Sequence, residues 1–480
     1  MFQKVRESML AKVGLLLFIL LLLCLPLGHI EDLIREREES RQEAATELAR
    51  THAGEQLLRG PVLLVPVTER WTEDVRDANG NTRFNVPQVA QRTHAVFPER
   101  LSVDGTLAPQ ERYRGIFRVM FYRLDAQLAG GFAPFDAKAI APRNRRATIE
   151  LGTPVLALSV SDVRGIEGLP GVTLAGETLK FAAQLPDTPE DRRLSGVQAP
   201  LAGAALQAWR EGRAMPFSMK LALVGQSRFA VAPLAEETTA HLRSPWPHPG
   251  FGGRFLAAER TVTPEGFEAR WRVSSLVSSA RAQFAARLDA AAGGERVSPA
   301  AQDDSFDVAM VQPLDVYAMS LRAAKYGALF IALVLMAAFM FEVFRQLRLH
   351  PIQYGLVGAS IALFFLLLVA LSEKLAFGLA YALSAGVSVA LLGAYFSAVL
   401  RGASRGWSLA AYVAVLYAAL YGLLVSESNA LLLGSLLLFG MLAVLMLLTR
   451  RVDWYGLAGG PAPAPVSAAD ATPRPAATTR

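Results

Sequence analysis

Five apolar stretches of membrane-spanning length follow one another in the last third of the 480-residue chain. A bilayer core of about 30 Å requires ~20 helical residues, and soluble cores do not place five such runs in succession. Charged residues make up only 19% of the chain, against about 25% in an average soluble domain. We therefore expect a transmembrane bundle made of Tyr326–Phe344, Tyr354–Ser372, Ala376–Leu400, Trp407–Val425 and Ala430–Leu448.

A sixth apolar run, Val13–Gly28, follows a positively charged N-terminus. It has the composition of either a cleavable signal peptide or an uncleaved anchor. Pro26 and Gly28 are a poor pair for a cleavage site, and Leu23 is too large to precede a lipidated Cys24. The sequence favours an uncleaved anchor, which makes six predicted spans.

The distribution of Lys and Arg predicts the orientation of these spans in the membrane. With a cytoplasmic N-terminus, the short outer loops carry only Lys374, whereas the cytoplasmic segments carry Lys4, Arg6, Lys12, Arg345, Arg348, Arg401, Arg405, Arg450, Arg451, Arg474 and Arg480. Positive residues accumulate on the cytoplasmic side of membrane proteins. We expect both termini in the cytoplasm and residues 31–322 on the outer side of the membrane.

The chain is predicted to be an α+β membrane protein whose outer part is mainly β. We expect a cytoplasmic start and anchor (1–30), a helical stalk (31–56), an outer mainly-β domain (57–322), a five-helix bundle (323–450) and a disordered cytoplasmic tail (451–480). The stalk residues suit either a coiled coil or a solvated helix that caps the domain. The solvated helix is favoured because the apolar stripe fades within two turns.

Short alternating runs with turn residues between them predict a β-sandwich or a curved sheet. The expected strands are Pro61–Val67, Glu111–Leu128, Ala147–Leu151, Pro154–Val163, Pro216–Val224, Phe229–Pro233, Phe255–Val262 and Phe267–Leu276. The last two flank Thr263–Gly266, a turn sequence that predicts a hairpin. Ala204–Glu211 and Ser279–Ala292 are expected to be helices, and the single cysteine excludes an internal disulfide.

Basic and aromatic residues interleave in Glu111–Leu128, a pattern that occurs on nucleic-acid surfaces. A strand with one apolar and one charged face explains it equally well, and an outside location argues against nucleic acid. The chain has no HExxH pair, no phosphate-binding GxxxxGK[ST] loop and no GxSxG elbow. We therefore expect no catalytic residue, no bound metal and no cofactor.

One loop, Ser244–Gly253, has the composition of a binding site. Its prolines hold the backbone extended while Trp246, His248 and Phe251 present rings, as in a groove for a ligand or a peptide. The alternative is a loop anchored by Trp246 into the sheet and followed by a glycine-rich turn. The three ring residues are the candidate contacts for a ligand or a protein partner.

Two further features lie near the predicted membrane boundary. Glu342 is either a proton or cation site or one half of a helix-end ion pair, since Arg345 follows three residues later. The ion pair is favoured. The segment Val311–Tyr326 either couples the outer domain to the bundle or anchors at the interface, and we favour anchoring.

Several sequence stretches resemble the CreD-type inner-membrane proteins, a cell-envelope integrity family of Gram-negative bacteria. The stretches cover the chain nearly end to end: His29–Ala44, Leu57–Val67, the RGIFRVMFY segment, Ser244–Leu256, Val311–Ile331, Phe341–Gly358, Leu371–Tyr381 and Thr449–Tyr455. The resemblance implies one N-terminal span, a large periplasmic domain and a C-terminal bundle. It also implies a link to envelope stress and to β-lactam and colicin sensitivity, without an enzymatic activity.

The leading hypothesis is a non-enzymatic inner-membrane protein that supports envelope integrity or the envelope-stress response. Its outer domain would bind a cell-wall component or a periplasmic or inner-membrane protein partner, and the lipid bilayer would surround its helices. The alternative is a transporter or lipid-handling protein with its site in the bundle. The sequence leaves the oligomeric state open.

Overall fold

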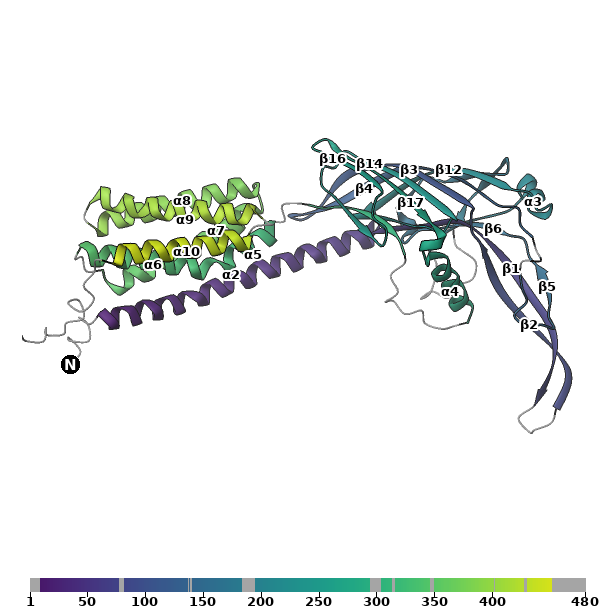
Figure 1. The fold of residues 1–480 in the computed structure, drawn as a ribbon, viewed down its shortest axis with the longest axis horizontal. Coiled ribbons are helices and arrows are strands. Elements are labelled where there is room, and N and C mark those ends of the chain that lie inside the picture. Colours follow the sequence, from purple (N-terminus) through teal and green to yellow (C-terminus); the bar gives the residue numbers. More distant parts are fainter. Residues whose placement is uncertain are drawn as a thin grey trace, which may run out of the picture. The chain divides into compact units, whose positions relative to one another are not determined.

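The computed structural model describes residues 9–450 except 77–81, 137, 139, 184–194, 294–303, 313–315, 346–348, 401 and 427–429. The chain divides into two compact units (Figure 1). Met1–Glu39 and Leu314–Arg480 form the first, called here the helical unit, and Ser40–Pro313 form the second, called the β unit. The predicted disordered tail, 451–480, lies outside the described residues.

Long apolar helices build the helical unit. They are the first part of α2 (Met9–Thr51), then α5 (Val316–Lys325), α6 (Gly327–Arg345), α7 (Pro351–Ser372), α8 (Phe377–Val399), α9 (Ala403–Val425) and α10 (Ala430–Thr449). Among the described residues, four helices are long and apolar enough to cross a membrane, and α5 with α6, bent by 44°, makes a fifth. The described apolar part of α10, Leu432–Ala443, is shorter. The prediction of six spans therefore stays a prediction.

Helix α2 continues from the first apolar run through most of the predicted stalk and ends at Thr51, before the expected boundary at residue 56. Within the helical unit, its Leu23 and Leu27 pack where α7 and α6 carry glycine. A Cβ added at Gly358 would lie against the Leu23 side chain, and one added at Gly327 would lie 2.7 Å from Leu27 Cδ2. Small residues of this kind let membrane helices approach closely.

The described residues of the β unit form two mixed sheets. The first has the order β10-β11-β6-β1-β13-β18-β15, with β2 and β5 also paired to β1; the second has the order β16-β17-β14-β3-β4-β12-β8-β9, with β7 paired to β12. The strands are β1 (Gln56–Arg76), β2 (Thr82–Val96), β3 (Arg100–Arg114), β4 (Phe117–Phe132), β5 (Thr148–Leu151), β6 (Val155–Ser159), β7 (Ile166–Glu167), β8 (Gly171–Leu174), β9 (Glu177–Lys180), β10 (Ala182–Ala183), β11 (Gly196–Pro200), β12 (Met215–Gln226), β13 (Arg228–Ala232), β14 (Glu237–Ser244), β15 (Pro249–Gly253), β16 (Glu259–Thr263), β17 (Gly266–Ser274) and β18 (Phe306–Met310).

The main core contains residues of both sheets, because alternate residues of each strand point to the same side. Strand β3 alternates exposed and buried residues from Arg100 to Leu107, and Val103 packs in the same cluster as Leu58 of β1 and Phe306 of β18. A smaller apolar cluster joins the other face of β1 and β13 to helix α4 (Ala280–Gly293) through Phe284. Helix α3 (Gly203–Arg210) contributes Trp209 to the main core.

Several predicted elements are confirmed. The hairpin around Thr263–Gly266 is present as β16 and β17, whose last register pair is Thr263 with Gly266. The helices predicted at Ala204–Glu211 and Ser279–Ala292 are present as α3 and α4, and the predicted strand Pro61–Val67 lies inside the long strand β1.

Three predictions about strands are wrong in detail. Glu111–Leu128 is not one strand, because Gly115 turns the chain at φ +59° between β3 and β4. The strand expected from Phe255 starts only at Glu259, after Gly253 (φ +81°) has ended β15. The expected glycine-rich turn is itself strand β15, paired with β18 over Pro249–Gly253.

Candidate functional site

Of the three ring residues singled out in the sequence, Trp246 and His248 precede strand β15 and Phe251 lies within it. The Trp246 indole N–H donates to the carbonyl oxygens of His248 and Val311, at 3.1 Å each, and its ring packs against the main core. Phe251 is half-buried, 5.7 Å from the Phe267 ring centroid, whereas His248 is exposed. These contacts support the anchoring interpretation of the loop, and a ligand contact by the three rings stays a prediction.

The glycines of β15 make room for its neighbour, β18. In the antiparallel register Gly252 lies opposite Asp307, and a Cβ at Gly252 would stand 2.8 Å from Asp307 Oδ1. At Gly253 a Cβ would stand 2.3 Å from the carbonyl oxygen of Ser305. The glycine pair therefore lets the Asp307 carboxylate lie beside the strand.

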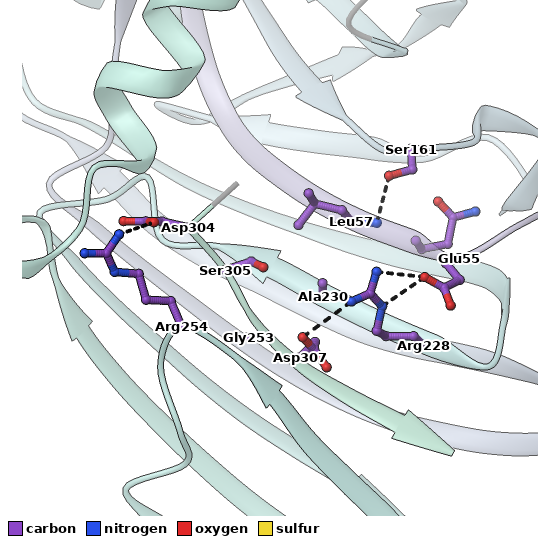
Figure 2. A pocket seen from close by; sticks show the side chains of 11 residues that line it. Glu55, Leu57, Ser161, Arg228, Ala230, Gly253, Arg254, Asp304, Ser305 and Asp307 are labelled. Carbon is purple, nitrogen blue, oxygen red and sulfur yellow. Dashed lines mark hydrogen bonds and ion pairs between the residues drawn. The ribbon is translucent and has the colours of Figure 1, made fainter. Parts of the chain in front are cut away.

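A cavity of about 640 Å³ opens beside this glycine pair, entirely within the β unit (Figure 2). It lies over the face of the first sheet opposite the main core, since Phe229, Val231, Phe306 and Val308 point into that core and the residues between them point away. Its lining residues are Glu55, Gln56, Leu57, Ser161, Arg228, Ala230, Gly253, Arg254, Asp304, Ser305 and Asp307.

Charged side chains stand at both ends of the cavity. At one end, Arg228 donates to Glu55 Oε2 from Nε (2.9 Å) and Nη2 (2.8 Å). At the other end, Arg254 Nη1 donates to Asp304 Oδ1 at 2.9 Å. Figure 2 shows these two pairs with Asp307 on the far side of the Arg228 guanidinium from Glu55. The cavity thus offers both guanidinium and carboxylate groups to a ligand.

The two buried aspartates of the cavity differ in their surroundings. Asp304 Oδ2 accepts from the Ser279 backbone N–H (2.7 Å) and hydroxyl (2.8 Å). Burial alone would raise the pKa of Asp304, but these bonds and Arg254 outweigh it and the pKa is lowered. For Asp307 burial dominates and, with the negative charge of Glu55, raises the pKa despite Arg228. Asp304 is a satisfied structural group and Asp307 is not.

Sequence reasoning found little of this cavity. The predicted loop Ser244–Gly253 supplies only Gly253 to its lining, and Arg228, Arg254, Asp304 and Asp307 were missed. The available signal was Asp307 within the apolar strand Phe306–Met310, where alternation places a carboxylate among residues that face away from the core. That Asp307 belongs to a cavity with Arg228 follows only from the pairing of β18 with β13, a strand that is distant in sequence.

In the helical unit, Glu342 forms the predicted kind of ion pair with an unpredicted partner. Its carboxylate accepts from Lys12 Nζ of α2 at 2.6 Å and from the Tyr354 hydroxyl of α7 at 2.5 Å. The side chain of Arg345, the expected partner, lies outside the described residues. The pair joins three helices, which explains the buried carboxylate without a proton or cation site.

A groove of about 450 Å³ lies between α9 and α10. Apolar side chains and glycine line it: Ala419, Gly422, Leu423, Leu433, Leu436, Leu437, Gly440 and Met441. It is the place in the helical unit where the alternative hypothesis of lipid handling would put an acyl chain.

Metal chemistry has no site among the described residues, where no group of three or more His, Cys, Asp or Glu side chains is arranged to hold an ion. The nearest arrangement is His241, with Nδ1 3.0 Å from Asp104 and Nε2 2.7 Å from Glu268. Arg243 and Arg270 pair with the same two carboxylates. This group is a cross-strand charge network on the second sheet.

Several helices of membrane-spanning length and apolarity, together with a β unit of two packed sheets, define a membrane protein that also carries a large β domain. The chain belongs to the CreD family. The family described as "Inner membrane protein CreD" matches residues 8–455. The chain is 34% identical over 436 residues to the "Inner membrane protein CreD" of Escherichia coli (strain K12), covering 91% of each chain.

Two of the solved structures that match are only weakly similar to the chain. An M1 zinc metallopeptidase from Deinococcus radiodurans aligns with 37% of this chain and 38% of its own, at a TM-score of 0.20 and 8% identity. A substrate-bound mutant of the same enzyme aligns at a TM-score of 0.20 and 9% identity, over 37% and 39%. Likenesses of this size carry no argument about fold or function.

Proposed function

We propose that this CreD-family protein is a non-enzymatic inner-membrane protein that supports cell-envelope integrity by binding an envelope component in the cavity beside Asp307. The proposal places residues 31–322 in the periplasm, where such a component is within reach. The observation that carries it is the cavity itself, because 640 Å³ falls in the range of about 300–1,000 Å³ typical of small-ligand sites.

The charge pattern of the cavity favours binding over catalysis. Glu55 and Asp304 are each held by an arginine, and no nucleophile stands beside a base among the lining residues. A site in which most charges are paired can recognise a polar ligand without reacting with it. Soluble fragments of the cell wall, which carry peptides, are polar ligands of suitable size.

The test is binding of muramidase-released cell-wall fragments to the full chain purified in detergent. Ala230 lies on the cavity wall, so Ala230→Phe fills the cavity and is expected to abolish binding. Ala222→Phe is the matched control, the same change on strand β12 of the second sheet. Fragments that do not bind, or that bind Ala230→Phe as well as the unaltered chain, would contradict the proposal.

A further inference from the structure

Asp307 is the one charged group of the cavity that the rest of the described chain leaves unsatisfied. The residue is 5% exposed, and its carboxylate makes no hydrogen bond to any residue that the structure describes. Its nearest cation is Arg228, whose Nη1 lies 3.9 Å from Oδ2, beyond hydrogen-bond distance. Asp307 lines the cavity, so its carboxylate is open to a hydrogen-bond donor that enters from there.

The surrounding strands keep Asp307 open instead of satisfying it. Arg228 is turned to Glu55, to which it makes two hydrogen bonds. On the neighbouring strand, Gly252 carries no side chain that could cover the carboxylate. Ala309, which shares a strand face with Asp307 two residues on, shows that this face of β18 needs no charged residue. The carboxylate therefore lacks a hydrogen-bond partner within the sheet and faces the cavity.

The chemical complement of such a carboxylate is an N–H donor with positive charge. A metal ion is disfavoured, because the guanidinium groups of Arg228 and Arg254 also line the cavity and would repel it. Arg254 has one acidic partner, Asp304, and its side chain is 63% exposed. The remaining N–H groups of Arg254 are suited to a carboxylate on the ligand.

We propose that the cavity binds a small ampholyte of the peptide type, whose ammonium group donates to Asp307 and whose carboxylate is held by Arg254. The proposal rests on the proposed function, since it names the ligand class of the same site. The burial that raises the pKa of Asp307 is offset when an ammonium group pairs with it, so the bound ligand stabilises the ionised carboxylate.

The test compares the same cell-wall fragments before and after acetylation of their free amines, on the full chain in detergent. Acetylation removes the ammonium charge and is expected to weaken binding about tenfold or more, the size of a lost charge-assisted hydrogen bond. Asp307→Asn is expected to weaken binding of the untreated fragments to a similar degree and to leave binding of the acetylated fragments unchanged.

Asp125→Asn is the matched control, an exposed carboxylate on β4 of the second sheet, and is expected to bind like the unaltered chain. A melting curve for each variant separates loss of binding from loss of fold. If untreated and acetylated fragments bind equally well, the ampholyte proposal is overturned while the proposed function stands. If neither binds, both proposals fail.

Discussion

At the scale of single residues, buried charges of the β unit are held by bonds that cross between strands and loops. Glu69 of β1 is 2% exposed. Its Oε1 accepts from Arg92 Nε of β2 at 2.7 Å, and its Oε2 accepts from the backbone N–H of Arg143 at 3.0 Å. Burial would raise the pKa of Glu69, but these bonds outweigh it and the pKa lies below its ordinary value of 4.5. The ionised carboxylate therefore stabilises the fold.

Replacing this carboxylate should measurably destabilise the β unit. Glu69→Gln leaves Arg92 without its charged partner and is expected to cost about 2–3 kcal/mol, the range for unmade hydrogen bonds of buried charged groups. Because the folded pKa is lowered, the stability that Glu69 contributes is present above pH 4.5 and is lost as the pH falls through the folded pKa. The difference in the free energy of unfolding between the variant and the unaltered chain should therefore become smaller as the pH falls.

The measurement is the free energy of unfolding of the full chain in detergent, at several values between pH 3 and pH 7. Circular dichroism of the sheets monitors the unfolding. Glu150→Gln is the matched control, because that carboxylate is 71% exposed and lies 3.6 Å from Arg70. It should cost less than about 1 kcal/mol. If the loss of stability in Glu69→Gln became larger as the pH falls, Glu69 would not be a carboxylate that stabilises the fold in its ionised form.

At the scale of elements, α2 is fastened to the other helices of the helical unit at two points. Lys12 pairs with Glu342 at 2.6 Å, and Arg37 lies 3.6 Å from Glu373 of the α7–α8 connection. The interval between these two basic residues corresponds to ~37 Å of helix, somewhat more than the ~30 Å hydrocarbon core. The two ion pairs are therefore separated by slightly more than the thickness of a bilayer core.

Loss of Lys12 should loosen this arrangement. Lys12→Gln leaves the Glu342 carboxylate, whose side chain is 4% exposed, without its cation. Breaking a buried pair costs about 3–5 kcal/mol, and we expect roughly 1–2 because the Lys12 side chain is partly exposed. The measurement is the unfolding transition of the helices in detergent.

The charge swap Lys12→Glu with Glu342→Lys tests whether the pairing itself is responsible and should recover at least half of the loss. Arg37→Gln is the comparison variant, since its pair is longer, at 3.6 Å, and its partner Glu373 is 16% exposed against 4% for Glu342. It should cost less than about 1 kcal/mol. Equal losses of stability in Lys12→Gln and Arg37→Gln would contradict the expectation that the Lys12–Glu342 pair contributes more than the Arg37–Glu373 pair.

At the scale of the whole molecule, the proposed orientation decides whether the cavity can meet an envelope component. The bias of Lys and Arg toward one set of loops favours a periplasmic β unit. The single cysteine, Cys24, makes this orientation testable, because a cysteine-free parent needs only one substitution.

In a Cys24→Ala parent, Leu169→Cys reports on the β unit and Ser404→Cys reports on the start of α9. Leu169 is 95% exposed, and Ser404 is exposed as well. With a membrane-impermeant maleimide, the cysteine at 169 should react in cells whose outer membrane alone is permeabilised. The cysteine at 404 should react only after the inner membrane is opened. The opposite pattern would overturn both the orientation and the proposed function.

The sequence alone was sufficient for the features that depend on neighbouring residues. Hydropathy predicted the apolar helices, residue spacing predicted that the first of them continues as a stalk, and turn chemistry predicted the hairpin at Thr263–Gly266. The same local signals failed at Gly115, because a turn inside a run with strand character depends on one residue's backbone freedom.

Only the tertiary structure decided where the unsatisfied charge lies. Lys12 meets Glu342 across 330 positions of sequence, and Glu55, Arg228 and Asp307 meet because β1, β13 and β18 are neighbours in one sheet. Local patterns determine which residues are buried, since burial depends on the period of helix or strand. Which charges then face one another depends on strand order and register, which no local pattern contains.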